Sequence, residues 1–286
     1  NDVTFSYLNN IPFRDQIKNR LKTLFDYARV SAPFERGNYF YFYKNDGLQN
    51  QSVLYRKADE DGEPEVFLDP NSFKEDGTIS LGGTAFSDDG SLFTYLISEG
   101  GSDWRKAITI DVNTKEQVED TLRNIKFSGV SWKGNEGFYY TRYEKPKDGE
   151  ELSGIVKNGK LFYHKKGTAQ DQDELIYEPK NEKARAGGGL TEDNRFLTIV
   201  VSEGTSGNKL MVQDLNTENG IVTLVDNLDN DHYVIDGKGD NILVYTNLEA
   251  PNYRLVEVDL NNPTPENWVD VIPESEHVLS VNSGGG

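Results

Sequence analysis

The sequence contains no cysteine, one methionine and three histidines. The absence of cysteine excludes disulfide bonds, thiolate zinc sites and a cysteine nucleophile, and it suits the cytoplasm and the periplasm equally. No apolar run approaches the ~18 residues of a membrane-spanning helix, and the first stretch, NDVTFSYLNN, lacks the basic and then apolar pattern of a signal peptide. We therefore expect no membrane partner, and a cytoplasmic or periplasmic location.

Basic residues are also scarce, with 30 against 48 acidic ones and a net charge of −18. This excess repels phosphate backbones, so we expect no nucleic-acid partner. The acidic clusters DEDG at Asp59 and DNLDND at Asp226 lack the Asp-x-Asp-x-Asn-Gly spacing of a calcium loop. We interpret both as solvated turns and expect neither a metal nor a cofactor.

One long helical pattern stands near the start, in IPFRDQIKNRLKTLFDY. Apolar residues recur there at roughly helical spacing: Ile11, Ile17, Leu21, Leu24 and Phe25. The pattern predicts a single amphipathic helix over residues 11–26, with Pro12 in its first turn. After Tyr27 the chain changes to short β-branched or aromatic runs separated by Gly, Asp and Asn clusters, which is typical of an all-β domain.

The apolar runs recur with a period. Five of them, each preceded by a turn of similar chemistry, are spaced by steps of 54, 45, 58 and 46 residues, counted between Tyr39, Phe93, Phe138, Phe196 and Ile242. The stretch SEGGSDWRKAITIDVNT (98–114) has a near twin in SEGTSGNKLMVQDLNT (202–217). Since a four-stranded blade needs about 40 to 50 residues, the period predicts a β-propeller.

The count gives five blades, and residues 277–286 resemble the first strand of a sixth. An irregular β-sandwich also places turns at short intervals, but the five recurrences weigh against it.

Four stretches carry a family resemblance: LFDYARVSAPFERGNYFYFYKNDGLQNQSVLYRK, GSDW, IKFSGVSW and APNYRLVEVDL. They resemble the N-terminal portion and propeller of the prolyl oligopeptidase family of serine peptidases, and the likeness covers essentially the whole chain. It implies an N-terminal helical segment over residues 1–33 that belongs with the peptidase domain, and an incomplete propeller of the seven-bladed type over residues 34–286. The implied partners are an α/β-hydrolase peptidase domain of the same protein and short proline-containing peptides, with the propeller excluding folded proteins.

The residues that would perform such chemistry are not found. A hydrolase nucleophile elbow needs Gly-x-Ser-x-Gly, and no such pattern occurs; Ser283 has Val281 two positions before it, and we interpret its surroundings as a Gly-rich loop. The three histidines, His164, His232 and His277, show no Ser and Asp constellation, so we interpret them as packing or surface residues. We expect this chain alone to be inactive.

The resemblance also implies two site residues, and we interpret Trp104 beside them as structural. Asp103, in GSDW, would pair with an arginine of the peptidase domain near the substrate, and Phe127 would line the pocket for the residue two before the substrate proline. Trp104 would pack between neighbouring blades. Without the resemblance, Asp103 is more simply the cap of a blade turn and Phe127 a core aromatic.

Two other interpretations of the chain stay open. One is a freestanding propeller that binds a peptide or protein, because a fold does not fix a function. The other is an engineered or proteolysed fragment. Whether the coding region continues into a segment with Gly-x-Ser-x-Gly distinguishes them.

Overall fold

The computed structural model describes residues 1–145, 149 and 156–281, and these form two compact units. One unit comprises residues 1–81 and 99–101, and the other residues 82–98 and 102–286. The described residues form two α-helices, twenty β-strands and three 3₁₀ turns, so the predicted all-β class is confirmed. Neither described helix is both long and apolar enough to cross a membrane.

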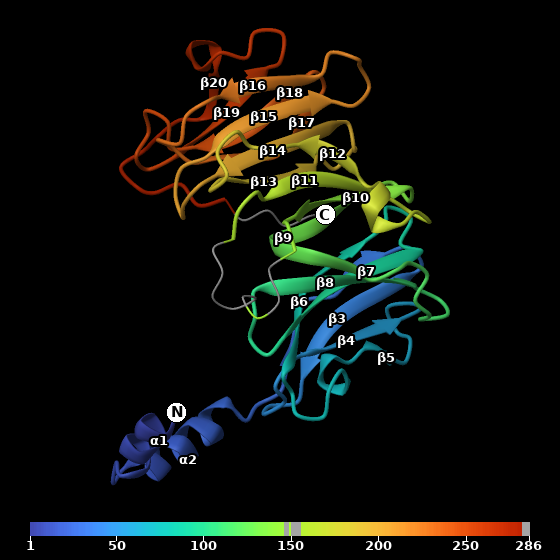
Figure 1. Cartoon of the computed structure of the whole chain (residues 1–286), viewed down its shortest axis with the longest axis vertical. Coiled ribbons are helices and arrows are strands. Elements are labelled where there is room, and N and C mark those ends of the chain that lie inside the picture. The colour runs from blue at the N-terminus through green and yellow to red at the C-terminus, as the bar shows by residue number, and fades with distance from the viewer. Residues whose placement is uncertain (146–148, 150–155, 282–286) are drawn as a thin grey trace. The chain divides into compact units, whose positions relative to one another are not determined.

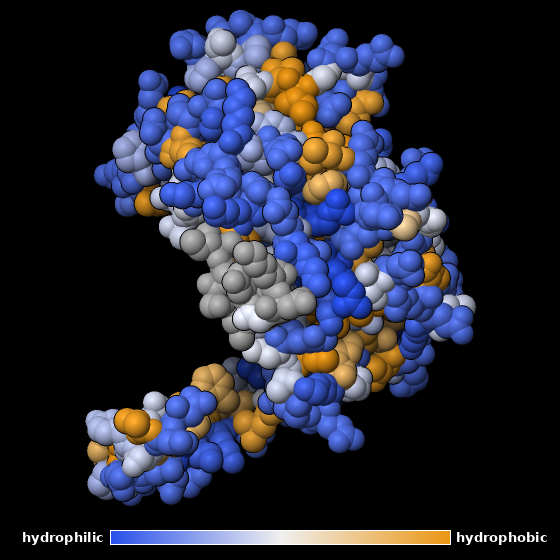
Figure 2. Space-filling view, viewed as in Figure 1, coloured by the Kyte–Doolittle hydropathy of each residue, from blue (hydrophilic) through white to orange (hydrophobic). Residues whose placement is uncertain are grey.

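The N-terminal segment forms two helices, α1 (Asp2–Asn9) and α2 (Arg14–Phe25), drawn in dark blue in Figure 1. The helix predicted over residues 11–26 is confirmed as α2, although it begins later because Pro12 lies in the turn before it. The second helix, α1, was not predicted, because its sequence lacks a helical apolar pattern. Neither helix buries a residue. Their exposed apolar side chains, part of which appear in orange in Figure 2, are Val3, Phe5, Tyr7, Phe13, Ile17, Leu21, Leu24 and Phe25.

The first unit contains one antiparallel sheet. Its strands are β1 (Arg29–Val30), β2 (Phe34–Arg36), β3 (Tyr39–Asn45), β4 (Val53–Lys57) and β5 (Glu65–Leu68). They pair in the order β1-β3-β4-β5, and β2 also pairs with β3. The aromatic run of β3 builds the local core, because Tyr41 is fully buried, stacks on Phe34 and meets Phe67 edge-on.

The next seven strands form one sheet in chain order. They are β6 (Ile79–Phe86), β7 (Leu92–Glu99), β8 (Trp104–Asp111), β9 (Leu122–Lys133), β10 (Gly137–Arg142), β11 (Lys160–Lys165) and β12 (Glu174–Tyr177). This sheet contains the second and third predicted blades. They are joined because the long strand β9 pairs with β8 through Leu122–Lys126 and with β10 mainly through Val130–Lys133.

Two four-stranded sheets follow, which correspond to the fourth and fifth predicted blades. The first contains β13 (Arg185–Leu190), β14 (Phe196–Ser202), β15 (Lys209–Asp214) and β16 (Ile221–Val225). The second contains β17 (His232–Lys238), β18 (Asn241–Thr246), β19 (Arg254–Asp259) and β20 (Val269–Ile272). Figure 1 shows them from yellow to red.

The first strand of a sixth blade was predicted over residues 277–286. No strand is formed in the described part of that range, residues 277–281. Leu279 makes only single contacts there: its N–H donates to the Asn252 carbonyl at 2.8 Å, and its own carbonyl accepts from the Tyr245 hydroxyl at 2.6 Å. Two isolated bonds do not make a strand ladder. Ser283 lies outside the described residues.

The recurring turns form the same hydrogen bonds in different sheets. In SDDGS the Ser87 hydroxyl accepts from the Leu92 N–H at 3.0 Å and donates to Asp89 at 3.1 Å. In TEDNR the Thr191 hydroxyl accepts from the Phe196 N–H at 3.0 Å and donates to Asp193 at 2.7 Å. The sequence repeats because each unit closes its hairpin with the same side-chain chemistry.

The β13–β16 sheet contributes side chains to core clusters on both of its faces. In β14, Phe196 packs into a core cluster with Ile242 and Val256 of the following sheet. The adjacent residues Leu197 and Ile199 pack into a different cluster with Leu161 and Tyr139 of the preceding sheet. Since successive side chains of a strand point to opposite faces, β14 holds two neighbouring sheets together.

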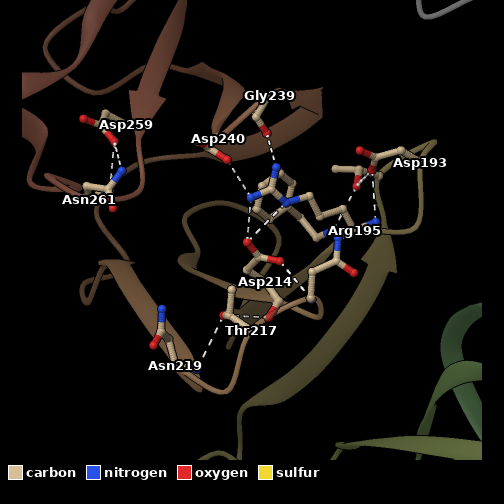
Figure 3. A network of polar contacts seen from close by, with 12 residues as sticks. Asp193, Arg195, Asp214, Thr217, Asn219, Gly239, Asp240, Asp259 and Asn261 are labelled. Carbon is tan, nitrogen blue, oxygen red and sulfur yellow. Dashed lines mark hydrogen bonds and ion pairs between the residues drawn. The ribbon is translucent and has the colours of Figure 1, made fainter.

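A polar network also joins the last two sheets (Figure 3). The Arg195 guanidinium pairs with Asp214 at 2.8 Å and with Asp240 at 2.7 Å, and it donates to the Gly239 carbonyl at 2.8 Å. The hydrogen bond from Arg195 holds the pKa of the Asp214 carboxyl below its usual range. Arg195 therefore links the β14–β15 hairpin to the turn between β17 and β18.

Candidate functional site

The three predicted site residues lie around one lysine. Asp103 and Trp104 stand at the start of β8, and Trp104 is paired across the ladder with Lys126 of β9. The Lys126 ammonium is 3.6 Å from a carboxylate oxygen of Asp103, 5.2 Å from the ring centre of Trp104 and 5.0 Å from that of Phe127. The structure thus brings together residues that are 24 positions apart in the sequence, 103 and 127.

Asp103 does not cap its own turn. The Trp104 N–H instead donates to the Ser102 hydroxyl at 3.1 Å. Among the described residues the contact recorded for the Asp103 carboxylate is Lys126, and its side chain is 63% exposed. The carboxylate is therefore accessible to a further cation.

Trp104 packs against the strand that follows β9 in the sheet. Its half-buried ring meets Tyr143, just after β10, edge-on with ring centres 6.1 Å apart. The ring therefore contacts Tyr143, a residue of the third predicted blade, and the role of Trp104 between blades stays a prediction.

Phe127 is not a core residue. Its side chain is 53% exposed, and its backbone φ is +51°, a left-handed conformation that is unusual for a bulky residue. It stands where β9 changes its pairing from β8 to β10. Such strain persists where the surrounding structure enforces it, and it often accompanies ligand sites.

A cavity of about 230 Å³ adjoins Phe127. It is lined from β9, β10, β13, β14, the β14–β15 loop and the start of β17, all within the second unit. The lining residues are Phe127, Thr141, Arg185, Gly187, Val200, Ser202, Gly204, Thr205, Ser206, Gly207, Asn208, Asp231 and Tyr233. The cavity combines two exposed aromatic rings, Phe127 and Tyr233, with hydroxyl and charged groups.

The loop SEGTSGN of the second twin is fixed against the chain before β17. The Gly207 N–H donates to Asp231 at 2.7 Å, and Asn208 exchanges hydrogen bonds with the backbone of His232 at 2.9 and 3.0 Å. Gly207 has φ +74°, and a Cβ there would stand 1.8 Å from the Leu228 carbonyl oxygen. Only glycine fits this position.

The first twin thus supplies Asp103 and Trp104, whereas the second supplies a cavity wall. Sequence reasoning missed the second contribution, because Gly, Ser and Thr in a hairpin loop look like ordinary turn chemistry. It also missed Arg185, which opens a Gly-rich strand. The signal that could have found Gly207 is the glycine itself, placed where the first twin has Asp103.

The acidic cluster at Asp226 is only partly a solvated turn. Asp226 is exposed and pairs with Lys209 at 2.6 Å, as that interpretation requires. Asp231 is half-buried and accepts hydrogen bonds from the Gly207 N–H and, at 2.8 Å, from the Tyr253 hydroxyl. Its bond to the Asp231 carboxylate raises the pKa of Tyr253 to about 12.

The histidines lie in three different settings. His164 is buried against Asp173 at 2.7 Å, and Glu119 is 3.8 Å from its other ring nitrogen. His232 is fully buried and pairs with the Thr246 hydroxyl at 2.8 Å, and burial lowers its pKa to about 4. His277 is exposed. None forms a cluster of three ligating residues within the described parts of the chain.

Sheets of this size, repeated along the chain and packed face to face, define a β-propeller domain. A family model described as "Prolyl oligopeptidase, N-terminal beta-propeller domain" matches residues 1–286. The chain belongs to this family.

Curated relatives include the prolyl endopeptidases of Elizabethkingia miricola and Elizabethkingia meningoseptica, each 48% identical over 284 residues. The match covers 99% of this chain and 40% of each relative, so the chain spans about two fifths of their length. Among solved structures, prolyl oligopeptidase B from Galerina marginata, bound to a 35-residue substrate, superposes with a TM-score of 0.84 at 28% identity. That match covers 96% of this chain and 42% of the other.

Proposed function

We propose that this chain is the substrate-filtering part of a serine peptidase that cleaves short peptides after proline. The observation that carries the proposal is the 48% identity to two prolyl endopeptidases over 99% of the chain. The chain has no Gly-x-Ser-x-Gly elbow, so the chemistry would come from an α/β-hydrolase domain of the same protein. The residues of this chain bind the peptide, orient the peptidase domain and exclude folded proteins.

The first role is to orient the peptidase domain. Asp103, with its exposed carboxylate, would pair with an arginine of that domain and aim it at a substrate carbonyl. Lys126 holds the Asp103 side chain from the other side, and Trp104 braces Lys126 through its ring. A carboxylate held in this way gives the arginine a fixed charged partner.

The second role is to bind substrate. The exposed ring of Phe127, held in a strained backbone conformation beside the cavity, would contact the side chain two residues before the substrate proline. A cavity of about 230 Å³ suits a single side chain and not a folded domain.

The domain boundary proposed from the sequence is residue 33. The exposed apolar side chains of α1 and α2 support a docking of residues 1–33 on the peptidase domain, since both helices are otherwise without a buried face. Residues 34–286 would then be the propeller proper. The absence of cysteine supports a cytoplasmic or periplasmic site of action, and the charge of −18 argues against nucleic-acid or membrane partners.

The test is hydrolysis of a blocked chromogenic peptide with proline before the scissile bond. We expect the complete protein to cleave it after proline, to lose that activity on treatment with a fluorophosphonate, and to leave a folded proline-containing protein intact. The 286-residue chain alone should show no turnover. If the complete protein binds such peptides without cleaving them, the chain belongs instead to a binding module.

A further inference from the structure

The cavity beside Phe127 contains an arginine that forms no ion pair with a carboxylate of the described residues. Arg185, the first residue of β13, is the one cationic side chain among the described lining residues. Its guanidinium carbon stands 5.5 Å from the ring centre of Phe127, and one Nη donates to the Gly204 carbonyl over a long 3.4 Å. No acidic oxygen of the described residues forms an ion pair with it.

Asp231, the one acidic group among the described residues that line the cavity, is already hydrogen-bonded through both carboxylate oxygens. One oxygen of Asp231 accepts from the Gly207 N–H at 2.7 Å, and the other accepts from the Tyr253 hydroxyl at 2.8 Å. Asp231 therefore stabilises the cavity wall and does not pair with Arg185. N–H donors of the Arg185 guanidinium remain for a ligand. A guanidinium has five N–H donors and binds carboxylates through two parallel hydrogen bonds.

We propose that Arg185 is a specificity-determining residue that selects an acidic side chain, glutamate or aspartate, two residues before the substrate proline. This inference rests on the proposed function, which places that side chain in the cavity. The Phe127 ring and the Gly204 carbonyl hold the guanidinium at the wall, so a substrate carboxylate meets a positioned partner. The hydroxyls of Ser202, Thr205 and Ser206 line the same cavity and complete a polar setting for an anion.

The protein's overall charge works in the opposite direction. A net charge of −18 repels an acidic peptide as it approaches, whatever the cavity contains. A raw comparison of acidic and neutral peptides therefore mixes two effects. The ratio of kcat/KM for the two peptides, compared between wild type and a variant that changes one charge, isolates the contribution of Arg185.

The experiment uses the complete protein and two blocked peptide p-nitroanilides, X-Ala-Pro, that differ only in Glu or Gln at X. The variants are Arg185→Gln and a matched control, Lys183→Gln, which removes an exposed positive charge two residues away and outside the cavity lining. We expect Arg185→Gln to lower the Glu/Gln ratio of kcat/KM about tenfold from its wild-type value, and Lys183→Gln to leave it within about twofold.

The Gln peptide reports independently on folding and on the proposed function. Its kcat/KM in Arg185→Gln measures every effect of the substitution other than the charge pair, and the kcat/KM of the Glu peptide should fall about tenfold further. Arg185→Lys, which keeps the charge and loses the planar fork, should give an intermediate ratio. If wild type cleaves neither peptide, the proposed function fails and this inference fails with it. If wild type cleaves both and the ratio is the same in Arg185→Gln, the inference alone is overturned.

Discussion

Replacement of Asp103 by asparagine separates an orienting role from a structural one. The side chain keeps its size and loses its charge, and with it the attraction to Lys126 at 3.6 Å. Because the Asp103 side chain is 63% exposed, this pair contributes on the order of 0–1 kcal/mol to the free energy of unfolding. The stability of the 286-residue chain should therefore fall by less than about 1 kcal/mol in urea denaturation.

Catalysis by the complete protein should fall much further. If Asp103 pairs with an arginine of the peptidase domain, the substitution removes a charge-assisted hydrogen bond worth about 1.5 to 3 kcal/mol. That loss corresponds to a decrease in kcat/KM of about one to two powers of ten for a proline chromogenic peptide. Asp120→Asn, an exposed carboxylate in the same unit, provides the matched control and should leave kcat/KM unchanged.

The opposite pattern would refute this reasoning. A loss of about 2 kcal/mol or more in the free energy of unfolding of the chain alone, together with unchanged kcat/KM in the complete protein, would show that Asp103 serves only to hold Lys126.

Three further predictions concern stability. Gly207→Ala should destabilise the chain by about 2 to 4 kcal/mol in urea, because the new Cβ collides with the Leu228 carbonyl and the backbone is left-handed, and a loss under 0.5 kcal/mol would contradict the geometry. His232 has a folded pKa of about 4 against about 6.5 unfolded, so the free energy of unfolding should be highest above pH 6.5 and should fall by up to about 3 kcal/mol as the pH drops from 6.5 to 4. His232→Asn should flatten that part of the pH profile, whereas His277→Asn, at an exposed site, should leave it unchanged. Arg195→Met should lower the melting temperature by several degrees, since the substitution leaves two carboxylates and a carbonyl without their shared donor, and an unchanged melting temperature would show that the network of Figure 3 adds nothing.

The sequence predicted the outer strands of each blade well and the first strands poorly. Strands such as β14 and β18 carry β-branched and aromatic runs, which are visible without a structure. The first strands β6, β13 and β17 instead contain glycine. In β13 a Cβ on Gly188 would stand 2.6 Å from Leu161, and in β17 one on Gly237 would stand 3.1 Å from Phe196.

The reason at β13 and β17 is that a neighbouring sheet approaches closely, and the close approach requires glycine where strand propensity prefers a branched side chain. A pattern based on side chains cannot detect a strand whose side chains are absent for packing reasons. The same limit applies to the second and third blades, which share strand β9. Strand β9 changes its pairing at Phe127, where φ is positive, and a phenylalanine in the sequence does not predict a positive φ.

The candidate site also contains residues that the sequence predicted and residues that only the structure showed. Asp103, Trp104 and Phe127 came from family resemblance, and the residue that gathers them, Lys126, was invisible because a lysine in a strand is usually a solvated one. Arg185 was missed for a similar reason. Its place in the cavity depends on the pairing of β13 with β14, which sets it opposite Ser202.

We propose that this chain forms part of the wall against which the substrate lies. Photo-crosslinking tests it most directly, with the complete protein and a proline peptide that carries benzoylphenylalanine two residues before the proline. After proteolysis and mass spectrometry, we predict label on fragments that contain Phe127, Arg185 or residues 200–208, and loss of that label when unlabelled peptide competes. Label found only in the peptidase domain or on α1 and α2, with none on those fragments, would contradict the account.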